Sequence, residues 1–409
     1  MLYFKNSELT STYRIALNTV LNWIKAAQNG KLSLELVKIG ERYYIASTAQ
    51  NVATVERLVE ERKKYRNSRN ARVVTPLPKF YELYDEKQIL DIISNLDIHH
   101  EIPLQYSYFD GGADYWDDYS NRMIADPAHN LLTRTIKLLD MNDNYVDDLI
   151  APFQKVNVVD LGPGNGLPVR EFLRRLMDRG VLGRYIAIDL SPSILEHLGR
   201  NLKTWFGDTS FFEPHLVDFT QERFGHILSQ SYLGEEVDQT ANILLYLGGT
   251  VANFRNPDDA LNVIHQSMGR NDLLVMSSKL DTAQSRRFFD FSSKPGASSL
   301  AANHRLILDL LTVDPADYEV EMGFDTNKNQ RYIQARLKVP LRIDFAFPGG
   351  TRSVELEKGD AILLWRFWQF NSVQVLSRLV SNGFYPLAST QTVDKEYILT
   401  VSPIKIESD

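Results

Sequence analysis

The chain has 409 residues, of which 44% are hydrophobic, and this length is enough to bury one large core or two to three smaller ones. It contains no cysteine, which excludes disulfides, thiolate metal sites and cysteine nucleophiles. No stretch approaches the roughly 18 consecutive apolar residues of a membrane span and no leader-like segment opens the chain, so we expect a cytoplasmic protein without a membrane partner. The histidines show no metal-binding spacing, and no metal is expected.

The net charge of −7 is unevenly distributed along the chain. Residues 1–75 contain 13 Lys and Arg side chains against 6 Asp and Glu side chains, whereas the remainder is acidic. This asymmetry is typical of a basic module attached to an acidic body. Residues 67–80 are polar and are interrupted by Pro76 and Pro78, which predicts a linker between the two.

The first 66 residues predict a small module of helices and a hairpin. Asn18–Lys25 has the apolar spacing of a short helix. Leu36–Ile45 alternates between apolar and polar residues and turns at Gly40, which predicts two antiparallel strands. A further helix is predicted over residues 50–66, with its apolar residues on one face.

This module resembles the excisionase/MerR-type helix-turn-helix family, whose TVxxWIxxGxL…VKIGxRxxI run it nearly matches. The resemblance implies a winged-helix-like module in which the helix around Thr19–Lys25 enters the major groove of duplex DNA and the wing near Arg42 contacts phosphate. The excess of basic residues agrees with this, because phosphate neutralisation needs Lys and Arg. The alternative is a docking or homodimer module that has kept the fold without binding DNA, with residues 50–66 as the dimer contact.

A nucleotide-binding βαβ unit is predicted after a helical segment, residues 81–150, that includes a helix over Glu86–Leu96. Its first strand, Val156–Leu161, is a β-branched run of the kind buried on both faces. Three glycines then lead into a helix, which brings bare backbone and a helix N-terminus to a ligand: Gly162, Gly164 and Gly166. The second strand, Tyr185–Leu190, carries Asp189 near its end, where a carboxylate can accept from both ribose hydroxyls.

The glycine spacing indicates which nucleotide is bound. A dinucleotide fingerprint needs glycine at position 167, which is Leu167, and no P-loop Lys-Ser/Thr follows the glycines. The pattern from Asp160 to Gly166, Asp-x-Gly-x-Gly-x-Gly, resembles motif I of the class I S-adenosyl-L-methionine (SAM) methyltransferases. The cofactor that this resemblance implies is SAM, with S-adenosyl-L-homocysteine as its product.

Three more strands complete a regular alternation with helices: Phe211–Asp218, Ala241–Leu247 and Asp272–Ser277. Such an alternation predicts an open parallel sheet with its ligand at the carboxyl ends of the strands. In class I methyltransferases an acidic residue at the place of Asp218 accepts from the adenine amino group, and Phe219 follows it here.

The body, roughly residues 100–403, resembles the histidine-specific methyltransferase family of ergothioneine biosynthesis, whose fungal relatives include an N-methyltransferase of a prenylated tryptophan. Four runs carry the resemblance: Tyr108–Asp118, Asp160–Gly166, Asp218-Phe219 and Leu247–Phe254. It implies an α/β fold, in which a Rossmann-like SAM-binding sheet over 151–313 and 358–403 carries an α+β lid. That lid would consist of the helices of 81–150 and a β-rich insertion over 314–357.

The same resemblance implies a substrate site. The family's asparagine, which carries the ammonium and carboxylate ends of the substrate, falls on Asn253, and Gly248 and Thr250 complete its loop. The side-chain pocket departs from the family pattern, because aromatic residues replace the family's tyrosine, glutamate and serine. A further aromatic residue stands at the place of the family's phenylalanine and adds another ring. These positions are Phe109, Trp116, Trp365 and Phe367. Aromatic rings cannot hold imidazole by hydrogen bonds, although an ordinary apolar core strand would have the same sequence.

We therefore expect a SAM-dependent N-methyltransferase that acts on an amine of a bulky or aromatic small molecule, amino acid or peptide, and not on free histidine. No catalytic residue is assigned, because positioning the amine is the main task of such an enzyme. The alternative is a DNA-associated regulator with a SAM-binding body. An NAD enzyme ranks third.

Overall fold

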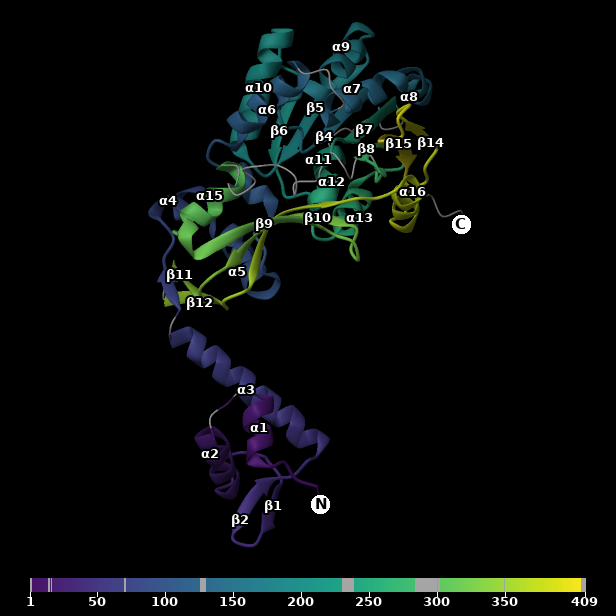
Figure 1. Ribbon diagram of the computed structural model, residues 1–409. Coiled ribbons are helices and arrows are strands. Elements are labelled where there is room, and N and C mark those ends of the chain that lie inside the picture. The colour runs from purple at the N-terminus through teal and green to yellow at the C-terminus, as the bar shows by residue number, and fades with distance from the viewer. Residues whose placement is uncertain are drawn as a thin grey trace. The chain divides into compact units, whose positions relative to one another are not determined.

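The computed structural model describes residues 2–13, 15, 17–69, 71–125, 130–229, 239–283, 300, 302–348 and 350–405 (Figure 1). The chain divides into two compact units. Unit 1 is Met1–Val74 with Leu337–Asp360, and unit 2 is Thr75–Arg336 with Ala361–Asp409. No helix in these described ranges is both long enough and apolar enough to cross a membrane.

The N-terminal part of unit 1 consists of three helices and a hairpin: α1 (Asn6–Thr12), α2 (Leu17–Gln28), β1 (Leu36–Ile39), β2 (Arg42–Ile45) and α3 (Ala49–Arg69). Its small core contains Leu9, Val20, Ile24, Ile45, Val55 and Val59. The buried Asn51 of α3 fixes the helix to the hairpin, because its side chain accepts from the Glu35 N–H at 3.0 Å and donates to the Ala46 carbonyl at 2.9 Å. The sequence did not indicate α1, since Leu9 is its one apolar residue.

A three-stranded sheet forms the rest of unit 1: β3 (Arg72–Val74), β11 (Leu341–Phe347) and β12 (Gly350–Leu356). Strand β11 pairs antiparallel with β12 and parallel with β3, with Leu341 opposite Arg72. The range 67–80, expected to be a linker, therefore contains the end of α3 and a paired strand. A strand of three residues that is followed closely by prolines gives too short a pattern to be seen in the sequence.

Unit 2 is built on a seven-stranded sheet with the order β14-β15-β8-β7-β4-β5-β6. The strands are β4 (Lys155–Leu161), β5 (Leu182–Asp189), β6 (Phe212–Leu216), β7 (Thr240–Tyr246), β8 (Leu273–Lys279), β14 (Ala388–Gln391) and β15 (Tyr397–Pro403). Strands β4 to β8 are parallel, and β15 runs antiparallel to both of its neighbours. The chain passes from β4 outward through β5 and β6 and then continues on the other side of β4 with β7, so the strand order reverses at β4. The predicted open parallel sheet is confirmed for β4 to β8, whereas the antiparallel pairing of β15 with β8 and β14 was not predicted.

Helices cover both faces of this sheet (Figure 1). One face packs against α7 (Leu131–Met141), α8 (Asp143–Ile150), α9 (Arg170–Asp178) and α10 (Pro192–Phe206). The other face packs against α11 (Gly225–Ser229), α13 (Pro257–Ser267) and α16 (Ser372–Ser381). Burial on both faces explains why the strand sequences are continuously apolar.

A second sheet of unit 2 has the order β13-β10-β9, formed by β9 (Tyr318–Asp325), β10 (Gln330–Leu337) and β13 (Ala361–Trp368). The remaining elements that the site uses are α4 (Pro78–Leu83), α5 (Glu86–His99), η1 (Leu104–Tyr108), α6 (Gly112–Ala125), α12 (Thr250–Asn253) and α15 (Ala302–Leu310). The sequence placed residues 358–403 with the parallel sheet, whereas β13 pairs antiparallel with β10, with Trp365 opposite Ile333. Its apolar run is indistinguishable from a buried parallel strand, and only the pairing partner tells them apart.

Candidate functional site

The loop after β4 adopts a conformation that depends on glycine. Gly162, Gly164 and Gly166 have φ values of 70°, 56° and 77°, in the left-handed region that side chains avoid. A Cβ on Gly166 would also lie 2.5 Å from Cδ1 of Leu198 in α10, so this glycine allows the helix to pack closely against the loop. The backbone of this loop is consequently open to a ligand at the carboxyl end of the central strand.

Two other predicted residues face this loop. A Cβ on Gly162 would lie 3.7 Å from Cγ2 of Thr250 and 3.9 Å from Cζ of Phe219. Thr250 begins α12, which follows β7, and Phe219 lies in the loop after β6. Residues from three separate motifs of the sequence are thus brought together where the strand order reverses, which is where open α/β sheets bind their ligands.

The predicted acidic residues lie at the ends of two neighbouring strands. Asp189 ends β5 and accepts from the Ser191 N–H at 2.8 Å, and burial raises its pKa to about 6. Asp218, after β6, accepts from the Thr220 N–H at 3.0 Å, and burial also raises the pKa of its carboxyl. Asp189 therefore remains able to accept from ribose hydroxyls at neutral pH, where it is ionised.

Asp160 lies in β4, directly before the glycine loop. It is buried at the end of β4, and its Oδ2 accepts from the Tyr185 hydroxyl at 2.8 Å. Burial raises the pKa of Asp160 to about 7, against the opposing effect of the Tyr185 hydrogen bond. The sequence did not single out Tyr185, because a tyrosine within a strand is an ordinary core residue.

The loop after β7 carries the predicted substrate residues. Gly248, with φ 80°, donates from its N–H to Ser277 Oγ at 2.8 Å, which fixes the start of the loop to β8. Asn253 ends α12, and its Oδ1 is buried without a hydrogen-bond partner among the residues that the structure describes. A buried amide oxygen without a partner is costly, so this atom is suited to accept from a ligand. Ser277 is a contributor that the sequence pattern did not reveal.

Two of the predicted aromatic residues border this loop. A Cβ on Gly249 would lie 2.8 Å from Cε2 of Phe367, so the ring of Phe367 is seated directly on the backbone next to Gly248. The Trp365 ring stacks beside Phe367, with 5.9 Å between centroids and 24° between planes. On the other face of β13, Arg366 forms a buried ion pair with Glu101. Glu101 also bridges to Leu363, which joins the segment after α5 to the edge of β13.

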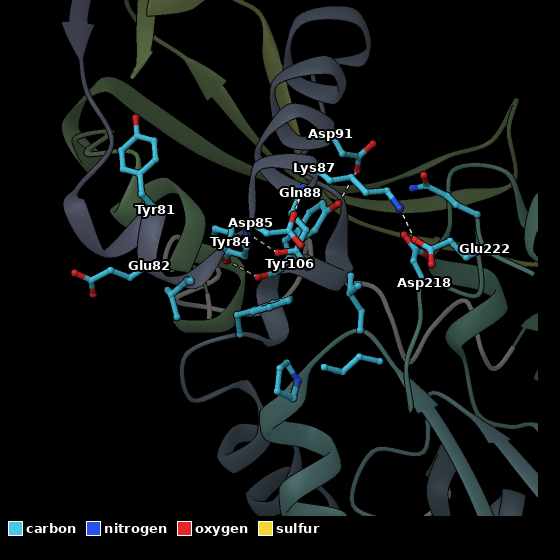
Figure 2. Close-up of a pocket in the computed structure, with 16 residues that line it drawn as sticks. Tyr81, Glu82, Tyr84, Asp85, Lys87, Gln88, Asp91, Tyr106, Asp218 and Glu222 are labelled. Atoms are coloured by element: carbon cyan, nitrogen blue, oxygen red, sulfur yellow. Dashed lines mark hydrogen bonds and ion pairs between the residues drawn. The ribbon is translucent and has the colours of Figure 1, made fainter. Parts of the chain in front are cut away.

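Phe109 lies elsewhere in the site. It lines a cavity of about 480 Å³ together with Asp218, Leu190 and Pro192, at the carboxyl ends of β5 and β6 (Figure 2). Its ring packs 5.1 Å from that of Tyr84, whose hydroxyl donates to the Tyr106 carbonyl. Figure 2 also shows Lys87 of α5 directed at Glu222, next to Asp218.

The side chain of Trp116, the remaining aromatic prediction, lies outside the described part of the structure, although its backbone belongs to α6. The next residue, Asp117, accepts through Oδ1 from Asn165 Nδ2 at 3.0 Å and so connects α6 to the glycine loop. In the ranges that the structure describes, no group of three or more His, Asp or Glu side chains is arranged to hold a metal ion.

Three features are typical of a Rossmann-like SAM-dependent methyltransferase: the reversal of strand order, the antiparallel β15, and the glycine loop with its acidic neighbours. A family model described as histidine-specific, SAM-dependent methyltransferase matches residues 86–402, and the chain belongs to this family. The cofactor is therefore SAM, which supplies the methyl group from its sulfonium.

Among the solved structures, three that resemble part of the chain at low identity serve as comparisons. A SAM-dependent methyltransferase from Clostridium acetobutylicum has a TM-score of 0.39 and 9% identity, over 73% of this chain and 100% of that one. The CcbJ methyltransferase from Streptomyces caelestis has a TM-score of 0.33 and 11% identity, over 65% and 90%. The glycopeptide N-methyltransferase MtfA, solved with SAM, has a TM-score of 0.33 and 13% identity, over 66% and 94%. No curated protein sequence matches the chain.

We expect Asp189→Ala to weaken SAM binding, because it removes the carboxylate that we assign to the ribose hydroxyls. Loss of a charge-assisted hydrogen bond costs about 1.5–3 kcal/mol, which corresponds to a roughly 10- to 150-fold rise in Kd by isothermal titration. Asp208→Ala, at an exposed turn after α10, is the matched control and should leave the Kd unchanged. An unaltered Kd in folded Asp189→Ala would contradict the assignment.

SAM affinity should also depend on pH. The raised pKa of Asp189, about 6, means that the carboxyl is partly protonated in the free protein at pH 5 to 6. SAM binding favours the ionised form, so affinity should rise as the pH increases through 6 and level off above it. Titrations with SAM at several pH values test this. Asp189→Asn keeps an oxygen that accepts from the Ser191 N–H, and it should abolish the rise in affinity near pH 6. A rise that persists in Asp189→Asn would assign it to another group, such as Asp160.

Proposed function

We propose that this methyltransferase acts on the amine nitrogen of a bulky or aromatic small molecule, amino acid or peptide, and that free histidine is not its main acceptor. The observation that carries the proposal is the contact between Phe367 and Gly249. It sets an apolar ring against the loop that holds Asn253, where recognition of imidazole would need polar groups. Trp365 extends this apolar surface along the same face of β13.

The environment of Asn253 favours a methyl acceptor that carries an ammonium group. Its buried Oδ1, without a partner among the described residues, can accept from an ammonium N–H, while the amide N–H2 can donate to a carboxylate. An amine must lose a proton and direct its lone pair at the methyl group before transfer. Holding the amine in that direction is the contribution that an asparagine at the end of a short helix can make.

A screen of acceptors tests the proposed function. The protein would be incubated with SAM and free histidine, tryptophan, related aromatic amines or short peptides, and methylated products would be followed by mass spectrometry. We expect turnover of an aromatic amine in preference to histidine. Efficient trimethylation of free histidine would overturn the proposal, and no turnover of any amine would favour the regulator as the alternative function.

With the acceptor that the screen identifies, Asn253→Ala should lower kcat/KM by about 10- to 150-fold, the equivalent of losing a hydrogen bond to a charged group. The Kd for SAM should remain that of the unmodified protein, because the side chain is assigned to the acceptor alone. Asn256→Ala, an exposed asparagine three residues later that caps α13, serves as a control for loop stability. A parallel loss of SAM affinity in Asn253→Ala would move this residue into the cofactor site.

As a second function, we propose that the helices and hairpin of residues 1–69 bind duplex DNA. Lys25 on α2 and Arg42 at the start of β2 are exposed, as are Lys31 and Lys38 between them. This places cations on the helix and on the hairpin that the helix-turn-helix resemblance assigns to DNA. The exposed Leu17 and Leu21 on α2 are the observation that favours the docking or homodimer alternative.

A gel-shift titration of the full-length protein with duplex DNA tests this second function. Binding should weaken steeply with rising salt, because counterions are released from phosphate. The double substitution Lys25→Gln and Arg42→Gln should reduce the salt dependence by up to two units of the log–log slope, whereas Lys395→Gln in unit 2 should not change it. No shift even at low salt would exclude DNA and leave docking or dimerisation.

A further inference from the structure

His304, on α15, is a partly buried polar residue that no motif of the family indicated. Its imidazole centroid lies 6.4 Å from that of Trp365, with 50° between the rings. Nδ1 is shielded from solvent and has no hydrogen-bond partner among the residues that the structure describes. A buried nitrogen without a partner is costly in a folded protein unless a ligand supplies the partner.

The imidazole is neutral under ordinary conditions, since burial lowers the pKa of His304 to about 4. A neutral imidazole has one nitrogen that donates and one that accepts. With the ring proton on Nε2, Nδ1 is an uncharged hydrogen-bond acceptor, which suits an N–H or O–H group of a ligand.

The position of His304 relates it to the proposed acceptor. Phe367 touches Gly249, Trp365 stacks beside Phe367, and His304 lies against Trp365. Because Trp365 and Phe367 are two residues apart on β13, they share one face of the strand. Pairwise contacts thus lead from Gly249 through Phe367 and Trp365 to His304.

We infer that His304 is a specificity-determining residue. Its Nδ1 accepts a hydrogen bond from an N–H or O–H on the ring of the substrate that is methylated. The inference rests on the proposed function and deepens it: the acceptor is an aromatic amine whose ring carries one hydrogen-bond donor. The amino end lies at Asn253, the ring lies along Phe367 and Trp365, and the ring donor reaches His304. A wholly apolar ring would leave Nδ1 without a partner and is disfavoured.

Matched acceptor pairs test this inference. Tyrosine and phenylalanine differ by one hydroxyl, and tryptophan differs from 3-benzothienylalanine by the exchange of a ring N–H for sulfur. We expect the unmodified protein to favour the donor-bearing member of at least one pair by tenfold or more in kcat/KM, mainly through KM. His304→Phe, which keeps a ring against Trp365, should reduce this preference to about twofold, mainly by raising KM for the donor-bearing member, without altering the Kd for SAM.

His304→Asn is the conservative variant, because its amide places a polar atom close to the position of Nδ1, and it should retain more of the preference than His304→Phe. If His304→Phe does not fold, His304→Leu replaces it with the same expectation, because leucine also lacks a hydrogen-bonding atom. Equal turnover of both members of each pair by the unmodified protein, or a preference that survives in His304→Phe, would overturn the inference while leaving the proposed function intact. No turnover of any amine in the screen would overturn the proposed function itself, and the inference with it.

Discussion

The site depends on the close approach of three loops at the carboxyl end of β4. Gly162 lies within van der Waals reach of Thr250 and Phe219, and any side chain at this glycine would fill the space between them. The approach is possible because β4 is central and has parallel neighbours on both sides, so the loops after β6 and β7 converge on its end. The glycine loop and the start of the loop after β7 therefore border the same space at the end of β4.

The proposed surface for the methyl acceptor lies on a strand outside the main sheet. Strand β13 presents Phe367 and Trp365 on one face, and on the other its Arg366 is paired with Glu101 in a buried position. Breaking a buried ion pair by removing one partner costs about 3–5 kcal/mol, so this pair holds β13 in its register. A one-residue slip would turn the aromatic residues away and bring Arg366 to the substrate loop. By opposing this slip, the Arg366–Glu101 pair keeps Phe367 and Trp365 on their face of β13, although the pair lies on the opposite face.

Local sequence predicted those parts of the molecule in which a short motif carries its own geometry. The three glycines and Asp189 fall within one βαβ unit, and the structure has the strands, the turn and the positive φ values that their spacing indicates. Residues that act across the fold could not be found in this way. In the sequence, Ser277 is an ordinary strand residue and His304 an ordinary helix residue. Only the fold brings the Ser277 Oγ to the Gly248 N–H and the His304 ring to Trp365. The pairing of β13 with β10 and of β3 with β11 was hidden for the same reason, because partners distant in sequence leave no periodic pattern.

The parallel pairing of β3 with β11 has a consequence for the order in which the protein is made. Arg72–Val74 leaves the ribosome early, and its partner Leu341–Ile343 emerges only after most of unit 2 has been synthesised. Until then β3 has an unpaired edge, while the helices and hairpin before it already possess a core of their own. Domains generally fold from the N-terminus as the chain emerges, but the completion of unit 1 must wait for Leu337–Asp360. A nascent chain arrested within unit 2 would carry a folded N-terminal module and an exposed β3, a species with a single open strand through which it could associate with a second copy.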